Sequence, residues 1–180
     1  MVGYREGLEL PFRERGKGCP LSTRKSAHLF VRPAAIEDVE SLAAFHAALA
    51  WETEGKRLAE DRLRLGTRAV LEDPNRGFYL VAEDRASPKV IAQLLVTYEW
   101  SDWRNAVFWW IQSVYVQVEW RRKGVFRHLY QYVLNVAKER GGVAGIRLYV
   151  ESENTIAQGV YQKLGLTMTP YRVFEDDFVL

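Results

Sequence analysis

The feature that most constrains this chain is residues 107–130, where a strand-like run leads through a basic turn into a helical pattern. Residues 107–118 are mostly β-branched and aromatic, and Arg and Lys gather around Gly124 before apolar residues recur at helical spacing. The first amides of a helix lack an intrahelical partner and lie at the positive end of its dipole. The stretch therefore predicts an anion site, for example for phosphate. A basic helix start after an ordinary buried strand is the alternative.

The composition favours one folded domain, since 180 residues with 48% hydrophobic content can bury a core. A net charge of +2 is too small to indicate nucleic-acid binding by itself. The single Cys excludes an intrachain disulfide, and the three His lack metal-ligand spacing, so we expect no metal. No apolar run reaches about 18 residues, and no secretory signal is visible, so we expect a cytoplasmic protein with no membrane partner.

Residues 1–27 differ from the rest of the chain, with six basic residues against three acidic ones and frequent Gly and Pro. Such a composition buries too little apolar surface to offset the entropy of ordering. We expect a disordered basic N-terminal extension, either a tail of the protein or the product of a wrongly assigned start codon. A basic arm for an anionic partner is a further alternative. One domain is expected over residues 28–180.

The hydrophobic periods from residue 28 onward predict the order β-α-α-β-β-β-α-β-α-β. We expect strands at 29–32, 78–83, 90–100, 106–118 and 146–150, helices at 34–51, 58–71, 125–140 and 154–164, and one or two closing strands within 166–180. Three consecutive strands from residue 78 predict an antiparallel meander, and the strand–helix–strand unit that follows predicts a right-handed parallel crossover. The fold class is α/β, a mixed sheet with helices on both faces.

Two motifs carry a resemblance to a known family. The first is residues 114–116 followed by Arg121 and Gly124, which resembles the acetyl-CoA-binding motif V-x-P-x-x-R-G-x-G-x-G/A of the GNAT superfamily of N-acetyltransferases. This copy departs from the motif at three slots, which hold Val118, Arg122 and Phe126.

The second motif is N-x-x-A-x-x-x-Y-x-x-x-G, complete here as Asn154, Ala157, Tyr161 and Gly165. Asn154 and Tyr161 are seven residues apart, so both face the same side of a helix. Helix capping alone explains the Asn and the Gly, but not the Tyr. With both motifs in order, the chain is identified as a member of the GNAT superfamily over residues 28–180, and it looks most like the branch that includes diamine and polyamine acetyltransferases.

The resemblance implies a GNAT-type sheet of about six to seven strands, in which the meander continues into two splayed parallel strands. Acetyl-CoA would lie between them as cosubstrate, without a metal. Backbone groups of residues 114–116 would bond its pantetheine arm, the turn at 122–127 would hold the pyrophosphate, and Asn154 would bond the pantetheine or the helix entry. The implied cofactor-binding residues are Val114, Tyr115, Val116, Arg121, Arg122, Lys123, Gly124, Val125, Phe126, Arg127, Asn154 and Tyr161.

Acetyl transfer from a thioester to an amine requires a base, an oxyanion donor and a proton for the thiolate. A strand-edge amide near residues 114–116 is the expected oxyanion donor. The resemblance places Tyr161 near the thioester sulfur. A phenol with a pKa of about 10 stays protonated at neutral pH, so Tyr161 is the expected acid. The catalytic base is expected to be Glu99 or Glu54; the other carboxylates considered are Glu52, Asp102 and Glu151.

The expected acceptor is a small-molecule primary amine, and the candidate substrate-binding residues are Glu52, Glu54, Trp100 and Gln112. The polyamine branch would carry acidic residues at the slots of Gln112 and Ser113. An amide accepts a hydrogen bond but cannot neutralise a polycation, so a monoamine or an amino-acid-like amine is an equal alternative. Strand alternation puts Trp109 and Trp110 on opposite faces, so at least one of them belongs to the core.

Other classes of function compete with an enzyme. A catalytically silent acyl-CoA-binding module stays open because the large Phe126 occupies a Gly slot. A nucleic-acid binder is disfavoured because no aromatic residues interleave with the basic cluster, so we expect no nucleic-acid partner. Homodimers are common in the superfamily and stay open here, although no residue indicates one.

Overall fold

The computed structural model describes residues 28–87 and 89–178, and it divides into two compact units, one up to Leu148 and one from Tyr149. The expectation of a disordered extension over 1–27 falls outside the described residues. The elements of the first unit are β1 (Leu29–Pro33), η1 (Ile36–Asp38), α1 (Val39–Glu54), α2 (Glu60–Glu72), β2 (Phe78–Asp84), β3 (Lys89–Ser101), η2 (Asp102–Arg104), β4 (Ala106–Val116), η3 (Val118–Trp120), α3 (Val125–Arg140) and β5 (Val143–Leu148). The second unit contains α4 (Thr155–Lys163).

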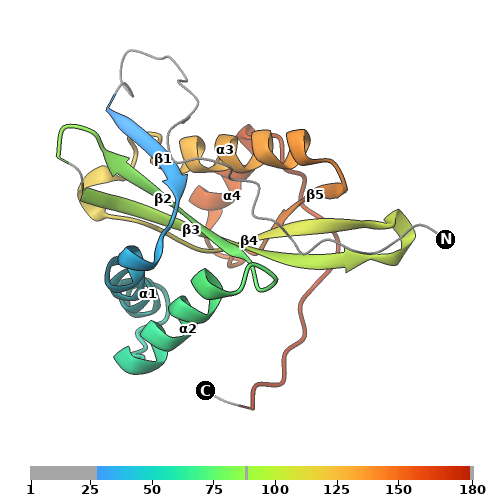
Figure 1. The fold of residues 1–180 in the computed structure, drawn as a ribbon. Helices are drawn as coiled ribbons and strands as arrows, with labels where there is room; N and C mark the ends of the chain where they lie inside the picture. Colours follow the sequence, from blue (N-terminus) through green and yellow to red (C-terminus); the bar gives the residue numbers. More distant parts are fainter. Residues whose placement is uncertain (1–27, 88, 179–180) are drawn as a thin grey trace. The chain divides into compact units, whose positions relative to one another are not determined.

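The sheet has the strand order β1-β2-β3-β4-β5 (Figure 1). β1 to β4 pair antiparallel, and β5 returns parallel to β4 after α3. This confirms the antiparallel meander, the parallel crossover and the mixed α/β class.

The strand count is lower than the prediction of six to seven, because five strands form among the described residues. Residues 166–178, expected to contain closing strands, have no strand structure. Their large apolar side chains are 63% to 96% exposed, namely Met168, Tyr171, Val173, Phe174 and Phe178. Apolar residues alone do not make a strand, because the backbone also needs a neighbouring edge to pair with.

β5 begins three residues earlier than the predicted start at residue 146. Gly141 and Gly142 both have positive φ angles, of 70° and 67°, and form the tight turn between α3 and β5. The Val107 amide then donates to the Gly142 carbonyl at 3.0 Å, so pairing with β4 starts directly after this turn.

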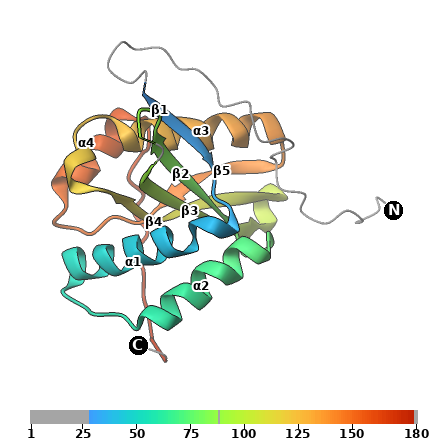
Figure 2. The same ribbon diagram turned by 60° about the vertical axis from the view of Figure 1, so that its left-hand side comes forward.

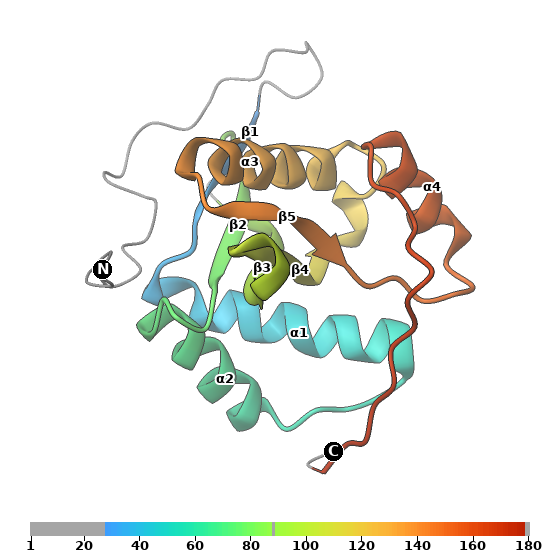
Figure 3. The ribbon, with the colours of Figure 1, turned by 90° about the vertical axis from the view of Figure 1, so that its right-hand side faces the viewer.

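Helices cover both faces of the sheet, with α3 on one and α1 and α2 on the other (Figures 2 and 3). Trp109 of β4 is 1% exposed and packs edge-on against Phe78, with ring centroids 5.2 Å apart, and beside Tyr98 at 6.4 Å. The prediction that at least one of Trp109 and Trp110 belongs to the core is therefore confirmed. Burying one such aromatic side chain contributes about 2–3 kcal/mol.

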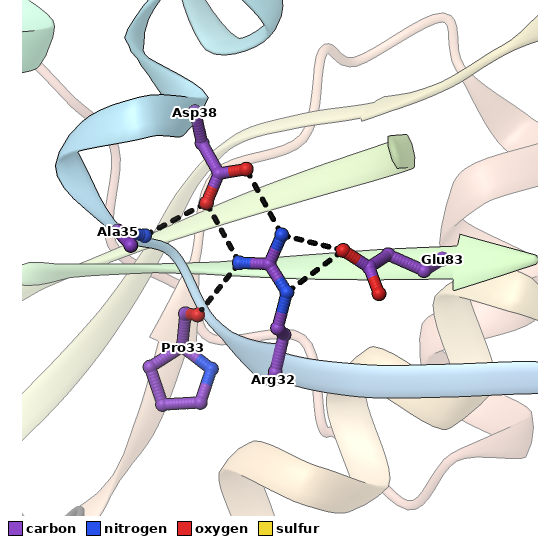
Figure 4. Close-up of polar contacts among 5 residues, drawn as sticks. All are labelled: Arg32, Pro33, Ala35, Asp38 and Glu83. Carbon is purple, nitrogen blue, oxygen red and sulfur yellow. Dashed lines mark hydrogen bonds and ion pairs between the residues drawn. The ribbon is translucent and has the colours of Figure 1, made fainter. Parts of the chain in front are cut away.

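A charged cluster ties β1, β2 and the entry to α1 together (Figure 4). The Arg32 guanidinium donates to both oxygens of Asp38, at 2.7 and 3.0 Å, and to Oε1 of Glu83 at 2.8 Å. Asp38 also accepts from the Ala35 amide at 2.7 Å. Burial acts to raise the pKa of Asp38, but the bonds from Arg32 and Ala35 outweigh it and hold this pKa below its usual value.

Candidate active site

The second half of β4 parts from β5. Their pairing ends at Ile111 and Leu148, whereas β4 continues to Val116. A bulge lies at the same place, since Gln93 of β3 opposes Tyr115 while Leu95, two residues on, opposes Gln112. The bulge residue Ser113 has a φ of 48°. Bulges redirect backbone groups, so residues 113–116 present a strand edge that β5 does not cover.

The basic turn that follows leads into the 16-residue helix α3. Gly124 caps this helix with a φ of 82°, a conformation that favours Gly even though a Cβ there would lie 4.0 Å from the His128 ring. The His128 amide donates to the Gly124 carbonyl at 3.2 Å, so the amides of residues 125–127 precede the first intrahelical bond. This is the geometry expected of a backbone anion site.

The side chains around the turn leave room for that role. Arg122, Lys123 and Arg127 are exposed. The Phe126 ring lies beside the Tyr130 ring, with centroids 6.2 Å apart, so the residue in the Gly slot packs against the next turn of its own helix.

Arg121 bonds to the protein itself and also brings together predicted cofactor and substrate residues. Its Nε donates to the Val116 carbonyl at 2.9 Å, and its guanidinium pairs with Glu52 of α1. The Tyr115 hydroxyl donates to the same carboxylate at 3.0 Å. Burial, and then Glu52, raise the pKa of Tyr115. Because the ion pair is partly exposed, it contributes at most about 1 kcal/mol, and its main effect is to fix the turn beside the end of β4.

The two candidate bases lie in different surroundings. Glu54 ends α1 and pairs with Lys56 at 2.9 Å, with both side chains exposed. Glu99, in the last part of β3, accepts from the Trp110 indole and pairs with Arg147 at 2.7 Å. Burial acts to raise the pKa of Glu99, but these two donors outweigh it and lower the pKa, which makes this carboxylate a weaker base.

The two other candidate acceptor residues lie on β3 and β4. Gln112 donates to the Thr97 hydroxyl at 2.6 Å across the two strands. Trp100 is 53% exposed near the end of β3. Glu52 is thus bonded to the basic turn through Arg121. Gln112 and Glu99 lie on the neighbouring strands β4 and β3.

The second motif forms α4 in its own unit. The Asn154 carboxamide oxygen accepts from the Ala157 amide at 3.0 Å, which makes Asn154 the N-cap and leaves its NH2 group as the part that could bond a cofactor. Burial raises the pKa of Tyr161. Gly165 follows the helix with a φ of 91°.

Three residues that form one chain of polar contacts from the bulge were not predicted from the sequence. Gln93 donates from Nε2 to the Ser113 carbonyl at 3.2 Å and lies 3.3 Å from Nδ1 of His46. Nε2 of His46 lies 2.9 Å from the Tyr79 hydroxyl. Burial lowers the pKa of His46 to about 4 and raises that of Tyr79 to about 12. The one available signal was a polar Gln within the apolar run VIAQLLV.

The sequence model of the acetyltransferase (GNAT) family matches residues 36–166. The chain belongs to this family. A solved structure described as a possible acetyltransferase from Clostridium difficile 630 is 42% identical, covers 85% of this chain and 99% of its own, and has a TM-score of 0.77. A comparison with curated proteins finds no match.

More distant GNAT-like structures share the fold. Glucosamine-6-phosphate N-acetyltransferase from Arabidopsis thaliana is 18% identical and covers 82% of this chain and 97% of its own, with a TM-score of 0.64. AAC(6')-Iy, solved with the bisubstrate analog CoA-S-monomethyl-acetylneamine, is also 18% identical and covers 84% of this chain and 99% of its own, with a TM-score of 0.68.

Membership of the GNAT family makes this protein an N-acetyltransferase, with acetyl-CoA as the cosubstrate that the family uses. Within residues 28–87 and 89–178, no three His, Cys, Asp or Glu side chains gather as a metal ion would require. No helix in that described part of the chain is both long and apolar enough to cross a membrane.

Proposed function

We propose that this GNAT protein transfers an acetyl group from acetyl-CoA directly to the primary amine of a small molecule. The proposal rests mainly on the edge of β4 at residues 113–116, which does not pair with β5 and leads into the basic turn and the N-terminus of α3. A strand edge can bond an extended pantetheine arm, and a helix N-terminus can bind a pyrophosphate.

The described residues fit acetyl-CoA with one change from the sequence prediction. The amides of residues 125–127 and the exposed Arg122, Lys123 and Arg127 would hold the pyrophosphate. Arg121 would act mainly on the protein, by fixing the turn through Val116 and Glu52. Phe126 packs beside Tyr130, which supports a turn with accessible amides.

The proposed reaction is a direct attack. The amine nitrogen forms a bond to the thioester carbon, the carbonyl oxygen gains negative charge, and the carbon–sulfur bond then breaks. The Val114 amide would stabilise the oxyanion. Tyr161, whose pKa burial raises, would keep its proton at neutral pH and give it to the departing thiolate. The amine loses its own proton to Glu54 or to a water chain, because the lowered pKa of Glu99 makes that residue the weaker base.

The charges near the site favour a monoamine or an amino-acid-like amine over a polyamine. Each of the three candidate carboxylates already has a cationic partner: Glu52 pairs with Arg121, Glu54 with Lys56 and Glu99 with Arg147. Gln112 carries no charge and bonds Thr97. A polycation would need carboxylates that are not already neutralised. A homodimer and a cytoplasmic location stay predictions.

Calorimetric titration with acetyl-CoA, followed by a thiol-release assay over an amine panel, tests the proposal. The panel contains amino acids, simple monoamines, a diamine, spermidine, neamine and glucosamine-6-phosphate. We expect binding of acetyl-CoA and release of CoA thiol with a monoamine or an amino acid. Binding without release from any amine would favour a silent module, and release with spermidine alone would restore the polyamine branch.

A further inference from the structure

One buried amide lies directly behind the β4 bulge and belongs to neither motif. Gln93 is in the middle of β3 and is 0% exposed. Its Oε1 has no hydrogen-bond partner in the described part of the chain. Burying an amide oxygen without a hydrogen bond destabilises the folded state. An apolar side chain would therefore stabilise this core position better, which indicates that the amide has another task.

The donor end of Gln93 shows what this task is. Nε2 donates to the carbonyl of Ser113 at 3.2 Å. Ser113 has a φ of 48°, a left-handed conformation that is unfavourable for a residue other than Gly. The hydrogen bond stabilises Ser113 in this conformation and so keeps the bulge in one shape.

The direction of a neighbouring amide follows from that bond. The Ser113 carbonyl and the Val114 N–H share one peptide plane, and in a trans peptide they point in opposite directions. The described residues contain no cis peptide bond. Because the carbonyl points toward the Gln93 side chain, the Val114 N–H points away from that side chain, at a residue of β4 that no longer pairs with β5.

Two further residues orient the Gln93 amide. Its Nε2 can only donate, so Nδ1 of His46 at 3.3 Å accepts. Nε2 of His46 then carries the proton of the neutral ring and donates it to the Tyr79 hydroxyl at 2.9 Å. Residues from α1 and β2 thereby fix the Gln93 amide with its donor toward Ser113.

We infer that Gln93 is a positioning residue for acetyl transfer. By holding the Ser113 carbonyl, it aims the Val114 N–H at the thioester carbonyl oxygen, where negative charge develops. The inference rests on the proposed function, because the thioester must lie at this edge of β4. Gln93 itself touches neither substrate.

The kinetic test compares the wild type with Gln93→Met, which keeps the length and loses the donor. Gln93→Asn, whose amide is one methylene too short to reach Ser113, is the second variant. We expect kcat to fall at least about tenfold in either variant, with the KM for acetyl-CoA within about twofold of wild type. Leu94→Met is the matched control, because it changes the neighbouring, fully buried side chain of β3, which makes no hydrogen bond, and it is expected to keep the wild-type kcat.

A spectroscopic test needs no acceptor. A hydrogen bond to the thioester oxygen polarises the carbonyl, so the 13C resonance of bound [1-13C]acetyl-CoA is expected downfield of the free ligand in the wild type and in Leu94→Met. Gln93→Met is expected to bind the ligand and lose this shift. Wild-type kcat or an unchanged shift in Gln93→Met overturns the inference alone. Failure of the wild type to bind acetyl-CoA overturns the proposed function and the inference with it.

Discussion

Lowering the pH from 7 to 5 is expected to destabilise the folded protein through one side chain, His46. Burial lowers its pKa to about 4, whereas a histidine in an unfolded chain has a pKa of about 6.5. Between these values the unfolded chain binds a proton that the folded chain does not, so the free energy of unfolding falls as the pH falls. Above about pH 6.5 both states are neutral at this residue and the effect disappears.

Burial is the cause of the lowered pKa of His46, and its hydrogen bonds also oppose protonation in the folded state. Nδ1 accepts from the Gln93 amide, so a proton on Nδ1 would place two hydrogen-bond donors next to each other inside the core. The interval between the two pKa values corresponds to about 3 kcal/mol in full, at about 1.4 kcal/mol for each pH unit, of which about 2 kcal/mol is lost by pH 5. That is a large share of the typical stability of about 5–15 kcal/mol.

Urea unfolding of the wild type and of His46→Gln at both pH values measures this effect. The Gln side chain does not titrate, and it can still present an amide to Tyr79. The pH dependence of the variant therefore reports all other groups, and its difference from the wild type isolates His46. We expect the wild type to lose about 2 kcal/mol more than the variant between pH 7 and pH 5. An equal loss in both proteins would refute the buried neutral histidine.

Three further predictions concern the charged cluster around Arg32, the basic turn at Gly124 and the proposed acid Tyr161. Asp38→Asn is expected to lower the free energy of unfolding at pH 7 by about 2 kcal/mol in urea, because it removes the carboxylate that Arg32 bonds, while the exposed Asp61→Asn has little effect. Gly124→Ala is expected to weaken acetyl-CoA binding several-fold in calorimetry through about 1 kcal/mol of strain, whereas Gly66→Ala, within helix α2, leaves the affinity unchanged. Tyr161→Phe is expected to lower kcat about tenfold or more without changing acetyl-CoA affinity; unchanged turnover would remove Tyr161 from the mechanism.

The parts of the fold that the sequence predicted are those set by local periodicity. The meander over β2, β3 and β4 follows from three strand-like runs separated by short turns, and the crossover follows from a helix placed between two strands. The prediction of closing strands was wrong. Residues 166–178 carry apolar residues, but they have no strand pairing in the described structure. Local pattern contains no information about whether a neighbouring edge is available.

The candidate site divides in the same way. Residues near a cofactor motif, such as Gly124 and the turn around it, could be proposed from spacing alone because their geometry is set within one turn of chain. The bonds of Arg121 to Glu52 and of Glu99 to Arg147 join residues 69 and 48 positions apart, and spacing could not reveal them. These pairings change what we expect of two residues: Arg121, predicted to bind the cofactor, would act mainly on the protein, and the lowered pKa of Glu99 makes it the weaker candidate base.

Gln93 shows why the shape of a strand edge is harder to predict than the residues that line it. The polar residue in an apolar run was visible, but its partner is a backbone carbonyl 20 positions away. That carbonyl turns toward Gln93 only because a bulge at Ser113 shifts the register between β3 and β4. A bulge depends on the pairing of two strands, and neither strand encodes it alone. The direction of the Val114 N–H is therefore a property of the folded sheet, and substitutions behind the sheet, not only those in the motifs, should change the rate of acetyl transfer.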